Sequence, residues 1–225
     1  MLRFEIISIF PRIFDSYFNT SIIGRALKRK LIKIKIHDLR KWTKDRHRTV
    51  DDRPYGGGPG MVMKADVLYQ AIKSVRGRIL GKSKKKVILL TPAGKQFDQR
   101  MAEKYGRLDR IIFVCGRYEG FDARVEKLVD EKISTGPYVL TGGELPAMAV
   151  IDAVTRLLPG AIRKESLEEE SFSKSIGEAE YPQYTRPEIL VIKDENSKIR
   201  KLKVPSVLLS GDQKRVKEWK LRHSG

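Results

Sequence analysis

The sequence predicts an α/β domain with a mostly parallel sheet, followed by a small basic C-terminal domain. Short apolar runs, such as 2–8 and 110–116, alternate along the chain with segments that have helical periodicity. The clearest helix is 143–160, because Met148, Ile151 and Val154 fall on one face. Strands that alternate with helices are joined most simply by crossovers, and crossovers place the strands parallel.

The elements of the first domain, residues 1–160, follow in order. Strand 2–8 precedes helical segments at 10–18 and 21–30, and an alternating strand covers 31–39. A glycine-rich loop then runs from about 44 to 63. The remaining expected elements are helix 64–75, strand 84–92, helix 95–108, strand 110–116, helix 121–132, the extended run 133–140 and helix 143–160.

Two further segments complete the expected organisation. Residues 161–180 contain six acidic and three basic residues with several serines, which indicates an interdomain linker. Residues 181–225 form the small basic domain, which we expect to be mostly helical. In it, 188–193 and 198–204 flank a polar turn and are able to pair as a hairpin, and a basic helix covers 211–223.

The charge balance favours a polyanionic partner. Lys and Arg number 46 against 28 Asp and Glu, which gives a net charge of +18. Such an excess fits nucleic acid. The alternative is a lysine-rich surface that only interacts with solvent, and composition alone does not separate the two.

Other classes are excluded by what the sequence lacks. No run of 18 apolar residues indicates a transmembrane helix, and the N-terminal stretch has no signal-peptide pattern. We therefore expect a cytoplasmic protein without a membrane partner. Cys115 is the only cysteine, and His37, His47 and His223 are scattered, so we expect no metal site.

Glycine-bearing loops mark the expected ligand site. The run TVDDRPYGGGPGM (49–61) lacks the strand, helix and lysine of a phosphate-binding loop. Three other loops, 89–95, 115–122 and 134–146, lie next to predicted strands, at the edge where open α/β sheets bind small ligands. They offer backbone N–H and C=O groups but no lysine that would bind a triphosphate. Such loops suit a ligand that is recognised by the edge of an adenine ring and by ribose hydroxyls. The alternative is that they are only tight turns.

Four motifs carry a resemblance to a known family. DRHRTVDDRPYGGGPGM (45–61), CGRYEGFDARV (115–125), YVLTGGELPAM (138–148) and YPQYTRPE (181–188) closely resemble bacterial tRNA (guanine-N1)-methyltransferases. This family belongs to the SPOUT class and methylates guanosine 37 beside the anticodon. The resemblance implies a deep trefoil knot toward the C-terminal half of the α/β domain. It also implies a homodimer with active sites at the subunit interface, S-adenosyl-L-methionine as methyl donor, and the anticodon-loop region of tRNA as partner.

The resemblance also implies particular site residues. Most residues of the methyl-donor pocket would act through backbone groups, and Glu119 is suited to face the donor's cationic end. The positions that match are Leu89, Leu90, Thr91, Pro92, Gly116, Tyr118, Glu119, Thr135, Gly136, Pro137, Tyr138, Val139, Leu140, Gly142 and Gly143.

Two residues match the catalytic pair of the family. Guanine N1 must lose a proton, so the reaction needs a general base and a cation that stabilises charge growing on O6. Glu170 stands at the position of the family's aspartate base, and Arg156 corresponds to the partner arginine. The alternatives are that Arg156 is only a polar helix residue and that Glu170 is interchangeable with Glu168 or Glu169.

The RNA side is assigned to the glycine loop and the C-terminal domain. Asp51, Pro59 and Gly60 are expected near the target guanine, and the expected tRNA contacts farther along the chain are Arg186, Lys217 and Lys220. The alternative for Asp51 is that it braces the loop by pairing with arginines. Other functions left open are methylation of a different RNA position, such as a ribose 2′-oxygen, and RNA binding without catalysis.

This sequence departs from the family pattern in several places. Glu170 replaces an aspartate, and Pro137 stands where aspartate is common. The segment 189–203 is longer than usual, and the chain stops soon after Trp219, which predicts a shortened C-terminal domain. The departures in the C-terminal domain bear on tRNA affinity or substrate range more than on the reaction.

Overall fold

The computed structural model describes residues 1–77, 83–163, 166–167, 181–193 and 199–224. The chain divides into two compact units, Met1–Lys164 and Glu165–Gly225. The domain boundaries expected from the sequence, 160/161 and 180/181, remain predictions, because most of the intervening segment lies outside the described residues.

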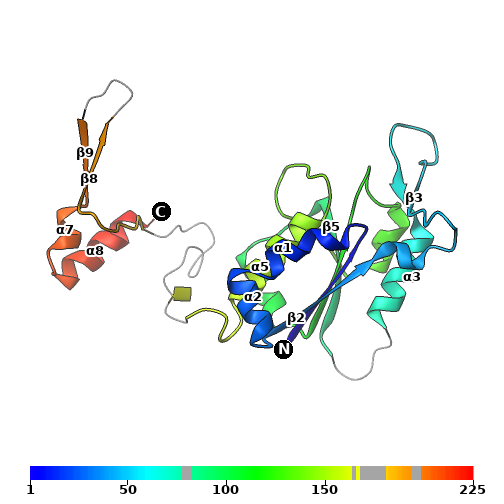
Figure 1. The fold of residues 1–225 in the computed structure, drawn as a ribbon, viewed down its shortest axis with the longest axis horizontal. Coiled ribbons are helices and arrows are strands. Elements are labelled where there is room, and N and C mark those ends of the chain that lie inside the picture. The colour runs from blue at the N-terminus through cyan, green and yellow to red at the C-terminus, as the bar shows by residue number, and fades with distance from the viewer. Residues whose placement is uncertain (78–82, 164–165, 168–180, 194–198, 225) are drawn as a thin grey trace. The chain divides into compact units, whose positions relative to one another are not determined.

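The first unit is built on a five-stranded parallel sheet in the order β2-β1-β6-β5-β7 (Figure 1). Every neighbouring pair is parallel, which confirms the predicted α/β domain with a mostly parallel sheet. The strands are β1 (Leu2–Ser8), β2 (Ile32–Asp38), β5 (Lys85–Gln96), β6 (Arg110–Cys115) and β7 (Glu131–Ser134).

Helices cover both faces of this sheet (Figure 1). Alternate residues of the strands point to opposite faces, so Phe113 of β6 packs into one core cluster while Val114 packs into the other. The helical elements on the Phe113 side are η1 (Pro11–Phe14), α1 (Asp15–Phe18), α2 (Ser21–Lys28), α4 (Gln99–Gly106) and α5 (Glu144–Arg156). Those on the Val114 side are η2 (Leu39–Trp42), α3 (Ala65–Arg76) and η3 (Ala123–Leu128).

The helices form where apolar spacing and end signals agree. Helix α3 buries Val67, Leu68 and Ala71 at three- and four-residue spacing. It ends at Gly77, whose φ of +61° is one that glycine adopts without steric cost. Helix α4 begins at Asp98, whose side chain accepts a hydrogen bond from the Met101 amide.

Two expectations for the first unit were wrong in detail. Residues 93–94, expected in a loop, and 95–96, expected at the start of a helix, continue β5, and the pairing with β7 shifts register between Leu90 and Lys95. Residues 121–132, expected as one helix, form the 3-10 helix η3 and the start of β7. The third glycine-bearing loop therefore follows a strand end instead of surrounding a strand.

The glycine-rich loop of 49–61 is closed by a small antiparallel ribbon. Strands β3 (Asp51–Asp52) and β4 (Val62–Met63) pair Asp51 with Met63. Between them Gly56, Gly57, Gly58 and Gly60 have positive φ values of 79° to 118°. Side chains rarely adopt these conformations, which accounts for the glycine run.

The described part of the second unit contains a hairpin as well as helices. Strands β8 (Ile189–Lys193) and β9 (Ile199–Lys203) pair antiparallel, which confirms the predicted hairpin. Helices α7 (Ser206–Leu209) and α8 (Gln213–His223) follow, and Asp212 caps α8 by accepting from the Lys214 and Arg215 amides. Within the described ranges, no helix is both long enough and apolar enough to span a bilayer.

Candidate functional site

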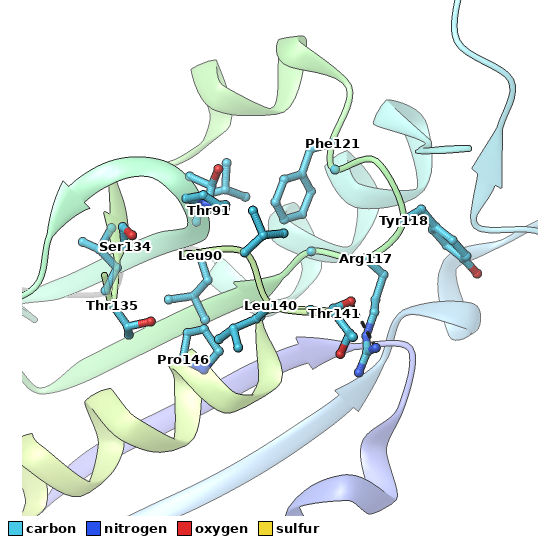
Figure 2. Close-up of a pocket in the computed structure, with 18 of the residues that line it drawn as sticks. Leu90, Thr91, Arg117, Tyr118, Phe121, Ser134, Thr135, Leu140, Thr141 and Pro146 are labelled. Carbon is cyan, nitrogen blue, oxygen red and sulfur yellow. Dashed lines mark hydrogen bonds between the residues drawn. The ribbon is translucent and has the colours of Figure 1, made fainter. Parts of the chain in front are cut away.

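A cavity of about 360 Å³ lies at the carboxyl ends of β5, β6 and β7 (Figure 2). Parallel strands run toward the same edge of a sheet, so the part of β5 from Leu89 to Pro92 and the loops that follow β6 and β7 converge there. Leu89 and Leu90 line it from β5, Gly116 from the loop after β6, and Thr135 from the loop after β7. The volume falls in the range of small-ligand sites.

Thirteen of the fifteen expected donor-pocket residues line this cavity. They are Leu89, Leu90, Thr91, Pro92, Gly116, Tyr118, Glu119, Thr135, Tyr138, Val139, Leu140, Gly142 and Gly143. Gly136 and Pro137 do not line it: Gly136 is buried and Pro137 is exposed. Tyr118 lies at the rim, half exposed, and its ring points away from the centre of the cavity (Figure 2).

Sequence reasoning missed several lining residues. All except Glu126, which lies in η3, are within or beside the three loops. The convergence of the strand ends was the signal that would have found them. They are Arg117, Gly120, Phe121, Glu126, Ile133, Ser134, Thr141 and Pro146.

Two glycines at this edge sit directly against another stretch of backbone. A Cβ on Gly143 would lie 2.8 Å from the Cα of Cys115, and one on Gly94 would lie 2.4 Å from the carbonyl carbon of Ile133. Both distances are shorter than real Cβ atoms make. The loops therefore pack at a separation that only glycine allows.

A buried ion pair joins the second loop to the third. The Glu144 carboxylate, 1% exposed, accepts from Arg117 Nε at 3.1 Å and from the Ser8 hydroxyl at 2.6 Å. Arg117 also donates to the Thr141 carbonyl at 3.1 Å, and its guanidinium lies 4.7 Å from the centre of the Phe10 ring. Sequence reasoning missed Glu144 and Ser8, although Ser8 ends β1 at the same sheet edge.

The glycine-rich loop lies beside the cavity. The Glu119 amide donates to the Met61 carbonyl at 3.0 Å, and a Cβ on Gly60 would meet the Glu119 side chain at 2.4 Å. Burial raises the pKa of Tyr118, and the neighbouring Asp51 carboxylate raises it further. The fold thus brings Asp51 and Gly60 next to the second loop, and Pro59 is exposed beside them.

Of the expected catalytic pair, only Arg156 lies in the described residues, and it does not line this cavity. Arg156 is in the last turn of α5, ten residues after Pro146, and so about 15 Å away along the helix axis. Glu170 lies outside the described residues, as do Glu168 and Glu169. The expected tRNA contacts Arg186 and Lys217 are exposed in the second unit. There Lys220 lies 4.4 Å from the Tyr181 ring centre.

Among the described residues, the cavity offers neither a thiol nucleophile nor a metal site. Cys115, at the end of β6, is buried and does not line the cavity, and burial raises the pKa of its thiol well above the usual value. In the described ranges no three His, Cys, Asp or Glu side chains are placed to hold a metal ion. What the site offers instead is backbone groups, apolar walls and the exposed carboxylates of Glu119 and Glu126.

The fold and site define an α/β protein with a small-ligand cavity at the carboxyl edge of a parallel sheet, joined to a small basic unit. A family model described as tRNA (Guanine-1)-methyltransferase TrmD matches residues 2–225. The chain belongs to this family.

Individual relatives agree with the family assignment, and each carries the name tRNA (guanine-N(1)-)-methyltransferase. The relative from Dictyoglomus turgidum is 45% identical over 225 residues, covering 100% of this chain and 85% of the relative. The relative from Mycoplasmopsis synoviae is 46% identical, with 98% and 91% covered. The relative from Chloroflexus aggregans is 49% identical, with 97% and 81% covered.

Proposed function

We propose that this protein transfers a methyl group from S-adenosyl-L-methionine to N1 of guanosine 37 in tRNA. The observation that carries the proposal is the convergence of three loops on one cavity in a chain that belongs to the tRNA (guanine-1)-methyltransferase family. The net charge of +18 suits a polyanionic substrate of this kind. A cytoplasmic location, where tRNA is found, is part of the same proposal.

The residues of the cavity fit the proposed methyl donor. Leu89, Leu90 and Pro146 supply apolar walls for an adenine ring. Gly116, Gly142 and the neighbouring backbone supply donors and acceptors at close range. The exposed Glu119 carboxylate is available to a cationic group. When bound, the donor supplies an already activated methyl group on sulfur.

The protein's own task is to deprotonate guanine and stabilise its charge. We assign removal of the proton from N1 to Glu170, a carboxylate in the segment before Phe172. We assign to Arg156 the stabilisation of the negative charge that grows on O6. This assignment rests on the family motif, because Arg156 does not line the cavity of its own chain and Glu170 lies outside the described residues.

The position of Arg156 supports a two-fold dimer. Partly or fully exposed positions on α5 recur at Leu145, Ala149, Asp152 and Arg156, which is one face of the helix. In an isologous interface the same face of both copies is in contact. A residue i of one copy then lies against residue j of the other, and j of the first lies against i of the second. If the axis passes between Ala149 and Asp152, Arg156 of each copy lies beside Leu145 of the other, next to that copy's cavity.

An exposed apolar surface next to α5 suits such an interface. Phe10, Ile13, Tyr17 and Leu145 are 40–55% exposed, although all are large apolar residues. Tyr17 donates a 2.5 Å hydrogen bond to Asp152, which links this surface to the exposed face of α5. Covering these side chains would stabilise a dimer by removing apolar area from water.

The trefoil knot belongs to the proposal as well. It is supported by family membership and by the close backbone contacts of Gly94 and Gly143, which are expected where chain segments pass each other tightly. The basic second unit is proposed to bind tRNA. Asp51 is proposed to accept from the exocyclic amine of a guanine, because carboxylates accept from such amines.

The test is transfer of a labelled methyl group into two tRNA transcripts that differ only at position 37, one with guanosine and one with adenosine. The proposal predicts label only in the guanosine transcript. Label in both transcripts would favour the alternative of another RNA position. Donor binding without transfer to either would favour an RNA-binding protein without catalysis.

A further inference from the structure

The β8–β9 hairpin exposes nearly all of its side chains. Five residue pairs join the strands, and every strand residue except Ile192 is exposed. The hairpin projects away from α7 and α8 (Figure 1). A two-stranded hairpin is only marginally stable alone in water, so a hairpin that leaves Val191 and Ile199 at 55% and 63% exposure is suited to a partner.

The pairing register sorts the side chains onto two faces. Residues directly opposite each other share a face, and successive residues alternate. One face, called here the lysine face, contains Ile189, Val191, Lys193, Ile199, Lys201 and Lys203. The other contains Leu190, Ile192, Arg200 and Leu202.

The lysine face is a row of positive charge within the two strands. Neither strand contains an acidic residue. Among the described residues, Lys193, Lys201 and Lys203 form no ion pair. Lys203 pairs with Ile189 at one end and Lys193 with Ile199 at the other, so the row spans four residue steps, or about 13 Å.

We infer that the lysine face binds the sugar–phosphate backbone of a double-helical stem of tRNA. This inference rests on the proposed function for the identity of the polyanion. Three cations in a row are complementary to successive phosphates. A duplex fits better than an unpaired strand, because the face has no aromatic ring and no arginine on which a base would stack.

The aliphatic side chains fit the same partner. Val191 and the two isoleucines lie between the lysines, and their side chains are shorter than those of lysine. The minor groove of A-form RNA is wide and shallow and is recognised by shape and backbone contacts without base readout. The contact is therefore independent of sequence and adds affinity and orientation to base recognition elsewhere.

The test is the salt dependence of tRNA binding to the full-length K193Q/K201Q/K203Q variant. Each phosphate contact contributes a slope of roughly 0.7–0.9, so loss of three lowers the slope by about 2.1–2.7. Between 50 and 200 mM salt the wild type should lose about 20- to 40-fold more affinity than the variant. R200Q removes one charge from the opposite face and should leave the slope nearly unchanged.

A second control separates this contact from bulk charge. K28Q/K33Q/K35Q removes three exposed lysines from the first unit. The same change of slope in this control would overturn the inference. An unchanged slope in the hairpin variant would also overturn it, provided that the circular dichroism of the variant is native. A loss for single-stranded RNA as large as that for tRNA would overturn the assignment to a stem. Failure of the wild type to methylate tRNA would instead refute the proposed function.

Discussion

Replacing Glu144 with glutamine tests whether the buried ion pair holds the cavity together. The substitution keeps the shape of the side chain but leaves Arg117 without its carboxylate. The two side chains are 1% and 17% exposed, so little water is available to replace the lost interaction. Breaking a buried pair on one side typically costs about 3–5 kcal/mol. Arg117 keeps the Thr141 carbonyl and the Phe10 ring, so we expect about 3 kcal/mol.

The assays are thermal unfolding and donor titration. A loss of 3 kcal/mol lowers Tm by about 6–12 °C in a unit of this size. Donor affinity should fall about tenfold, or 1.4 kcal/mol, because Arg117 and Thr141 no longer fix two walls of the cavity. Lys132→Gln is the control, because Lys132 does not line the cavity. Its pair with Glu126 is 36% and 46% exposed and contributes about 0–1 kcal/mol. A Tm and donor affinity for Glu144→Gln equal to those of the control would refute the reasoning.

Three other substitutions test the assigned roles. Glu170→Gln should lower single-turnover methyl transfer by about 10²–10⁴-fold with donor affinity unchanged, and a larger loss in Glu169→Gln would show that the base is misassigned. Arg156→Ala should lower the same rate by about 10²–10³-fold, and a parallel loss of donor affinity would make Arg156 structural. Asp51→Asn should reduce discrimination against other bases at position 36 or 37 by about tenfold, or 1.4 kcal/mol, and unchanged discrimination would favour the bracing role.

The fold was predictable where apolar periodicity and turn signals agree. Helix α5 and the β8–β9 hairpin fall into this class. Prediction failed at 93–96, because Pro92 and Gly94 normally indicate a turn. Gly94 is required there for another reason, since its Cα lies against the backbone of Ile133 and leaves no room for a Cβ.

The position of the cavity was predictable from topology, but the side-chain contacts that hold its walls were not. Parallel strands end at one edge, so the three loops were expected to meet. The contact between Ser8 and Glu144 joins positions 136 residues apart and depends on tertiary packing alone. The catalytic pair marks another limit, because no local pattern shows whether Arg156 serves the cavity of its own chain or that of a second copy.

The most direct test of the central claim is the identity of the methylated nucleoside. Wild-type protein, S-adenosyl-L-methionine and a guanosine-37 transcript are incubated together, and the digested RNA is separated by chromatography with mass detection. The account predicts N1-methylguanosine as the product. A 2′-O-methylated nucleoside, or no methylated nucleoside from protein that binds the donor, would contradict it.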